Sequence, residues 1–149
     1  MSVYLSPNFT LQELIVSQTA ARQGLRNLPG PGERVNLERL AKTVLQPLRD
    51  HVGRPVVITS GYRSLAVNRA VGGSSGSAHM SGLAADLHIP GMSVRQVMHT
   101  IKGLQLPFDQ MIDEFGSWVH VGLSTGRNRH QILNARFVNG RAHYTELKL

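Results

Sequence analysis

The order in which helical and extended apolar patterns follow one another limits the fold more than any other feature of this sequence. A capping box at Thr10–Glu13 opens a helix that we expect to run over Leu11–Ala21. Apolar residues then recur at helical spacing over Val35–Leu48, where the helix either kinks at Pro47 or ends near Gln46 and resumes. Two helices therefore precede every predicted strand.

The rest of the chain alternates between extended and helical patterns. Short helices are expected at Leu65–Val71 and after the N-cap Ser93, and the basic tail Arg127–Leu149 can add a strand or lie as an ordered coil. The first predicted strand is continuous and β-branched, which is typical of a buried strand. Strands are expected at Val56–Thr59, Leu83–Ile89, Gln110–Glu114 and Trp118–Leu123. This order predicts an α+β fold, a small single domain over residues 1–149 with a mostly antiparallel sheet flanked by helices.

Composition narrows the chemistry that such a domain can carry out. The 149 residues include no Cys, so a bound metal must be held by His and carboxylate side chains. Lys and Arg number 16 against 9 Asp and Glu, and the net charge of +7 favours polyanionic partners such as nucleic acid, anionic lipid or charged cell-wall polymers. The sequence has no signal-peptide pattern at its start and no bilayer-length apolar run, so we expect a soluble chain without a cleaved signal of its own.

Three short segments carry side chains that can bind a metal ion or a charged group. The run from Ser77 to Asp86 places the imidazole of His79 in a Gly/Ser-rich loop and a carboxylate in the strand that follows. Alternation in the last predicted strand leaves His120 on the face opposite to the core. Arg63 follows the end of the first predicted strand, where a guanidinium can hold a carboxylate or a carbonyl. Each residue alone is typical of an ordinary loop or surface position, but the three segments occur together.

Together these segments resemble the zinc D-Ala-D-Ala carboxypeptidase and L-alanyl-D-glutamate endopeptidase superfamily, peptidase family M15, and most closely its small phage-associated single-domain branch. The resemblance implies one zinc ion per chain, bound by His79, Asp86 and His120 with water as the fourth ligand. It also implies that Arg63 orients the substrate and that Ser77 donates a hydrogen bond to it. It covers roughly residues 9–124 and rests on Ser60-Gly61-Tyr62-Arg63-Ser64, Asn68, Val71-Gly72-Gly73, the Ser-x-His-x-x-Gly-x-Ala-x-Asp run, Phe108-Asp109-Gln110 and Trp118-Val119-His120-Val121.

The general base is the one part of the expected site at which the chain departs from the family pattern. Many members carry Glu or Asp three residues before the third zinc ligand, where this chain has Ser117. A three-residue turn at Phe115–Ser117 would place Glu114 on the His120 face, diagonal to it, whereas a two-residue turn would place Asp113 there. We favour Glu114 as the catalytic base, because its longer side chain suits the diagonal reach and because Glu before an aromatic-Gly turn resembles the phage-type branch.

The remaining candidates have smaller expected roles. His88 shares a strand face with Asp86, where it could be a competing ligand or a hydrogen-bond partner of the ligands. Trp118 is expected either to pack beside the metal, which we favour, or to contact the substrate. Manganese or cobalt could occupy a His/His/Asp site in place of zinc. Four other histidines are expected at the surface: His51, His99, His130 and His143.

The resemblance implies a zinc metallopeptidase that hydrolyses peptidoglycan stem peptides by a metal-activated water, of either the carboxypeptidase or the endopeptidase type. We expect a monomeric phage or prophage endolysin with no nucleic-acid partner and no membrane insertion. It is expected to be made in the cytoplasm without a signal peptide and to act on the cell wall in the periplasm or after lysis. The alternative is a noncatalytic zinc-stabilised peptidoglycan-binding module, because the Hedgehog signalling domains use the same scaffold for recognition. A nucleic-acid binder would rest on charge alone, since aromatic residues make up only 5% and no known motif appears.

Overall fold

The computed structural model of the chain describes residues 2–149 and opens on a hairpin that the sequence pattern did not indicate. In it β1 (Tyr4–Ser6) pairs with β2 (Phe9–Thr10). The predicted helix over Leu11–Ala21 is wrong as a single element, because it divides into α1 (Leu11–Ile15) and α2 (Gln18–Gln23). The division occurs at Ser17, whose side chain caps α2 by accepting a 3.1 Å hydrogen bond from the backbone of Ala20.

The long amphipathic helix begins earlier than predicted and contains a wide turn. It runs as α3 (Pro31–Leu40), the π-helical turn η1 (Ala41–Leu45) and α4 (Gln46–Val52). Pro47 lies in the first turn of α4, directly after the π-helical turn, whose wider winding accommodates a residue that cannot donate a backbone hydrogen bond. The helix therefore resumes at Gln46 after a change in winding, close to one of the two predicted outcomes.

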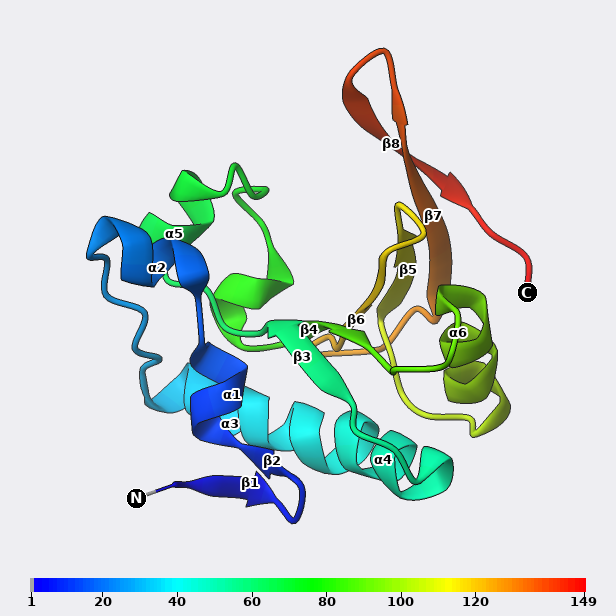
Figure 1. The fold of residues 1–149 in the computed structure, drawn as a ribbon, viewed down its shortest axis with the longest axis horizontal. Coiled ribbons are helices and arrows are strands. Elements are labelled where there is room, and N and C mark those ends of the chain that lie inside the picture. Colours follow the sequence, from blue (N-terminus) through cyan, green and yellow to red (C-terminus); the bar gives the residue numbers. More distant parts are fainter. Residues whose placement is uncertain (1) are drawn as a thin grey trace.

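A mixed sheet forms the centre of the part of the chain that the structure describes (Figure 1). Within residues 2–149 its strand order is β3-β4-β6-β5-β7-β8, and each neighbouring pair is antiparallel except β5 with β7, which is parallel. The strands are β3 (Val57–Ser60), β4 (Ala84–His88), β5 (Gln110–Glu114), β6 (Trp118–Gly122), β7 (Gln131–Val138) and β8 (Arg141–Glu146). The predicted α+β class with a mostly antiparallel sheet is confirmed, and the tail adds a hairpin of two strands.

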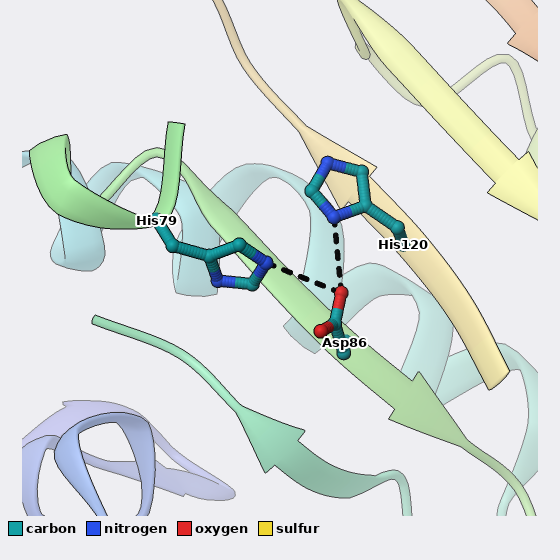
Figure 2. A group of neighbouring side chains, drawn as sticks. All are labelled: His79, Asp86 and His120. Carbon is teal, nitrogen blue, oxygen red and sulfur yellow. Dashed lines mark hydrogen bonds and ion pairs between the residues drawn. The ribbon is translucent and has the colours of Figure 1, made fainter. Parts of the chain in front are cut away.

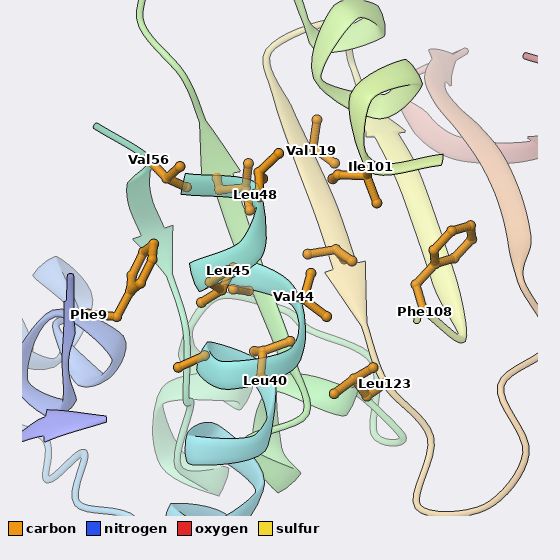
Figure 3. Packing of buried hydrophobic residues seen from close by; sticks show 14 of the residues in the cluster. Phe9, Leu40, Val44, Leu45, Leu48, Val56, Ile101, Phe108, Val119 and Leu123 are labelled. Carbon is orange, nitrogen blue, oxygen red and sulfur yellow. The ribbon is translucent and has the colours of Figure 1, made fainter. Parts of the chain in front are cut away.

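One face of this sheet carries the hydrophobic core. Side chains of the long helix and of α6 (Val94–Gly103) pack against alternate residues of the central strands, as Figure 3 shows for Val44 and Ile101 on the helices and Val119 on β6. Val119 and Val121 are fully buried, as their alternation with His120 predicted. The first strand differs from expectation, because β3 lies at the edge of the sheet with its residues only partly covered.

The other face of the sheet is the floor of an open region between two arms (Figure 1). One arm contains α5 (Leu65–Ala70) and the glycine- and serine-rich segment after it, and the other is the β7–β8 hairpin. The 3₁₀ turn η2 (Ala78–Ser81) returns the chain from the first arm to β4. Across residues 2–149 the helices are too short or too polar to cross a lipid bilayer.

Candidate metal centre and cleft

His79 is held in one orientation by the backbone of a distant segment. Its Nδ1 lies 2.7 Å from the carbonyl oxygen of Gly61, and because a carbonyl can only accept, Nδ1 carries the hydrogen and donates it. The backbone of Arg63 also donates to the carbonyl of His79, at 3.1 Å, which ties the end of β3 to η2. In the neutral imidazole this leaves the lone pair on Nε2, which points to Asp86.

Asp86 lies between the two imidazoles (Figure 2). Its Oδ1 is 3.3 Å from Nε2 of His79 and 3.0 Å from Nδ1 of His120. The strand register explains the second contact, because Asp86 on β4 and His120 on β6 are directly paired. Potential ligand atoms of the three residues all lie within 4.8 Å of one another, and this His–Asp–His group is the set that could hold a metal ion among residues 2–149.

The chemistry of this group calls for a cation between its members. Within residues 2–149, Nε2 of His79 is buried and has no hydrogen-bond partner, although a carboxylate oxygen lies nearby. Burial lowers the pKa of His79 despite the opposing effect of Asp86, which favours the neutral imidazole with its lone pair facing the carboxylate. Two electron-rich atoms then face each other, and a divalent cation bound to both would remove the repulsion. The donor set of two imidazoles and one carboxylate fits zinc.

The Asp86 carboxylate is kept ionised by its neighbours. Burial acts to raise its pKa, but hydrogen bonds and charges from His120 and His79 outweigh burial and hold the pKa well below the usual range. Its other oxygen, Oδ2, lies 3.7 Å from Nη2 of Arg63. Arg63 in turn donates from Nη1 to Oδ1 of Asn68 at 3.2 Å, so its guanidinium is fixed beside the metal-capable group.

The turn between β5 and β6 determines which carboxylate faces the cleft. Glu114 pairs with Trp118 and Ile112 pairs with His120, so the connection is the predicted three-residue turn at Phe115–Ser117. Glu114 therefore lies on the same sheet face as His120, in the neighbouring row. Burial raises the pKa of Glu114, with a further contribution from the Asp86 charge, while His120 and Arg63 act against the rise.

Asp113 points to the opposite face and is engaged in structural contacts. Its carboxylate accepts hydrogen bonds from Arg95 Nε at 2.8 Å and from Arg136 Nη2 at 3.2 Å, and it also accepts from the backbone of Gly116 at 2.9 Å. The two-residue turn, which would have brought Asp113 to His120, does not form. Of the two carboxylates left open by the sequence, only Glu114 lines the cleft.

The three ligand candidates lie in a polar cleft of about 880 Å³. Arg63, Ser77, Glu114 and Trp118 also line it, so every predicted site residue is brought to one place. The hydroxyl oxygen of Ser77 accepts from the backbone of His79 at 3.3 Å, which leaves its hydrogen free to donate into the cleft. Arg129 and three residues of the β7–β8 hairpin also line the cleft: Gln131, Leu133 and Tyr144.

Some candidates lie elsewhere, and some contributors were missed. His88 is on β4 two residues after Asp86 but outside the metal-capable group, and the four other histidines are exposed, as predicted.

Sequence reasoning assigned no role to Gly61, which orients His79, or to Asn68, which is 2% exposed and holds both Arg63 and the carbonyl of Ser74. Their roles depend on contacts between distant segments. Tyr144 was missed because the tail alternates too weakly to place it.

Comparison with known proteins agrees with this geometry. The sequence model of a family described as peptidase M15 matches residues 7–122, which is more than half of the chain. The chain belongs to the peptidase M15 family and is a hydrolytic peptidase. Among curated proteins, none is significantly similar to the chain. The matched region contains the metal-capable group, Arg63 and Glu114, and it ends before the C-terminal hairpin.

Proposed function

We propose that the chain is a zinc-dependent peptidase that hydrolyses the stem peptides of peptidoglycan and acts as a phage or prophage endolysin. The observation that carries the proposal is the buried Nε2 of His79, which faces the ionised carboxylate of Asp86 without a hydrogen. Membership of the peptidase M15 family supports peptide-bond hydrolysis as the reaction. His79, Asp86 and His120 would hold the ion, which when bound supplies a Lewis acid and a water of lowered pKa.

The residues around this group have complementary tasks in the proposed reaction. Glu114 accepts the proton of the attacking water and later returns it to the leaving amine, and its raised pKa brings it closer to neutrality, where a general base is most effective. Arg63 holds a carboxylate or carbonyl of the substrate, because its guanidinium is fixed by Asn68 and borders the cleft. Ser77 donates a hydrogen bond to the same part of the substrate.

The proposed substrate agrees with the charge of the protein. The net charge of +7 favours binding to anionic envelope polymers, and the cleft is open enough for a peptide that remains attached to a larger network. The proposed place of action is the cell wall, reached in the periplasm or after lysis, and the proposed form is a monomer. Both the carboxypeptidase and the endopeptidase reactions fit this cleft, and the new termini in the products identify the bond.

The test compares the peptidoglycan fragments released by three samples. They are the wild-type chain supplemented with zinc, the wild-type chain treated with a chelator, and the Glu114→Gln variant. Wild type should release fragments, chelation should stop release, and zinc should restore it, with products identified by mass spectrometry. Glu114→Gln should bind one zinc ion and be at least about 100-fold slower, which is the usual contribution of a general base. Glu146→Gln is the matched control, since Glu146 is exposed on β8 and does not line the cleft.

Two outcomes would contradict the proposal in different ways. If Glu114→Gln turns over the substrate as fast as Glu146→Gln does, Glu114 is not the general base. A wild-type chain that holds one zinc ion and binds peptidoglycan but releases nothing would favour the noncatalytic zinc-stabilised binding module.

A further inference from the structure

The wall of the cleft opposite Arg63 comes from a part of the chain that the family comparison does not include. The family match ends at residue 122, whereas β7 and β8 begin at Gln131 and Arg141. In Figure 1 this hairpin stands on the far side of the sheet floor from α5. Gln131, Leu133 and Tyr144 line the cleft from it, so the hairpin contributes directly to the surface that a substrate meets.

The strand register brings Tyr144 into line with Glu114. Glu114 on β5 pairs with Ala135 on β7, and Ala135 pairs with Tyr144 on β8. Paired residues share a sheet face, and adjacent strands lie about 4.8 Å apart, so Tyr144 is two strands away from Glu114 on the cleft side. Only the methyl group of Ala135 stands between them in this row, which lets the phenol ring extend over β7 to the site.

The surroundings of Tyr144 give its hydroxyl a hydrogen to donate and no internal partner to receive it. Partial burial and the negative charges of Glu114 and Asp86 raise the pKa of Tyr144, so the phenol stays protonated at neutral pH. Within residues 2–149 no hydrogen bond fixes this hydroxyl, and the side chain is 53% exposed while it lines the cleft. A neutral hydroxyl donor suits a neutral carbonyl acceptor, whereas a substrate carboxylate is better held by the cationic guanidinium of Arg63.

We propose that Tyr144 is a substrate-binding residue whose hydroxyl donates a hydrogen bond to a backbone carbonyl oxygen of the peptide, across the cleft from Arg63. This inference rests on the proposed function and adds to it the second point at which the peptide is held. It also assigns a role to the β7–β8 hairpin, which places that hydroxyl over the sheet.

The experiment measures steady-state kinetics of the zinc-loaded full chain on the stem peptide whose cleavage has been identified. Tyr144→Phe keeps the ring and removes only the hydroxyl. It should raise KM roughly 2- to 10-fold, the effect of one hydrogen bond, with kcat changed by less than about twofold. Calorimetry should find the same loss of affinity for the uncut peptide when Tyr144→Phe is added to the Glu114→Gln background. Thr145→Val is the matched control, because it removes a hydroxyl from the neighbouring residue, which pairs with Asn134 on the other face of the hairpin.

The possible failures are distinguishable. Unchanged KM and unchanged peptide affinity in Tyr144→Phe, with an active wild type, would overturn the role of Tyr144 and leave the proposed function intact. An equal effect of Thr145→Val would also overturn it, since the change would then be a property of the strand. A wild-type chain that cleaves nothing overturns the proposed function and this inference with it.

Discussion

Asp113 and Glu114 are neighbours in the chain with the same charge, yet their environments give them opposite tasks. Asp113 faces Arg95, Arg136 and the backbone of the turn, and Glu114 faces the cleft. The alternation of side chains along β5 separates them, so one carboxylate holds the hairpin and the other is available for chemistry. A shift of the register by one residue would exchange the two environments.

Asp113→Asn should therefore reduce stability and flatten its pH dependence. Burial acts to raise the pKa of Asp113, but the hydrogen bonds from Arg136 and Arg95 outweigh it and lower the pKa below its usual value. Because the pKa of Asp113 is lower in the folded state than in the unfolded state, its ionised form stabilises the fold. This stabilisation is present above about pH 4, the pKa in the unfolded state, and is lost as the pH falls through the pKa in the folded state. The variant should lose about 1 to 3 kcal/mol in urea unfolding at pH 7.

The same unfolding series at lower pH separates this role from a catalytic one. The difference between wild type and Asp113→Asn should shrink as the pH decreases from about 4, because protonated Asp113 no longer pairs with the arginines. Activity per folded molecule should stay near that of wild type. A variant that is as stable as wild type but inactive would transfer the catalytic role to Asp113.

The residues proposed to bind a metal were easier to predict from the sequence than the residues that orient them. His79, Asp86 and His120 lie in short patterns whose spacing is visible along the chain, whereas Gly61 acts through its carbonyl and leaves no trace in residue chemistry. The role of Asn68 likewise depends on two segments that only meet in the fold. Local pattern identifies reactive side chains, but their orientation is set by long-range contacts.

At the scale of elements, the junction of α1 and β3 sets the position of His79 in the metal-capable group. The backbone of Tyr62 donates to the carbonyl of Leu14 at 2.8 Å, and a side chain at Gly61 would overlap that same carbonyl. Glycine at position 61 therefore allows the end of β3 to pass close to α1. This close approach places the Gly61 carbonyl where it receives the Nδ1 hydrogen of His79.

Gly61→Ala should consequently weaken both the fold and the metal site. We expect a loss of about 1 to 3 kcal/mol from overpacking, together with a roughly 10- to 100-fold weaker zinc affinity because His79 loses its orientation. Urea unfolding and competition with a chromophoric chelator measure the two effects. Gly103→Ala is the control, since a side chain there meets nothing within 4 Å in α6. It should leave the zinc affinity unchanged and raise the free energy of unfolding by about 0.4 to 1 kcal/mol. Unaltered zinc affinity in Gly61→Ala would show that the carbonyl does not orient the ligand.

Elements with strong local signals were predicted well, and elements defined by long-range pairing were not. The capping box at Thr10 and the N-cap at Ser93 both form and open their helices as expected, and Ser93 also forms a capping box with Gln96. The break at Ser17 was missed because apolar spacing continues through it, and the π-helical turn η1 leaves no local signature. In the tail, β7 pairs in parallel with β5, some twenty residues earlier, and polar residues on both of its faces hide the strand pattern.

On the scale of the whole molecule, the site depends on two arms that lie on opposite sides of one sheet face. The metal-capable group lies over β4 and β6, near the middle of the sheet, and each arm contributes lining residues from a different part of the sequence. The core on the opposite face keeps these strands in place while leaving the cleft side free of apolar packing. Stability and chemistry are thus divided between the two faces of the sheet.

This division predicts how removal of the metal affects the folded state. Because the three ligand candidates come from η2, β4 and β6, a bound ion ties elements that separate on unfolding, and zinc at 100 times its Kd should add about 2.7 kcal/mol of stability. For a chain of this size that corresponds to a rise in Tm of roughly 5 to 10 °C in thermal unfolding with zinc relative to chelator. His120→Ala should abolish the rise, whereas His99→Ala, which alters an exposed histidine on α6, should retain it. An equal rise in all three proteins would place the zinc outside the His–Asp–His group, since a ligand stabilises the fold only through the site that it occupies.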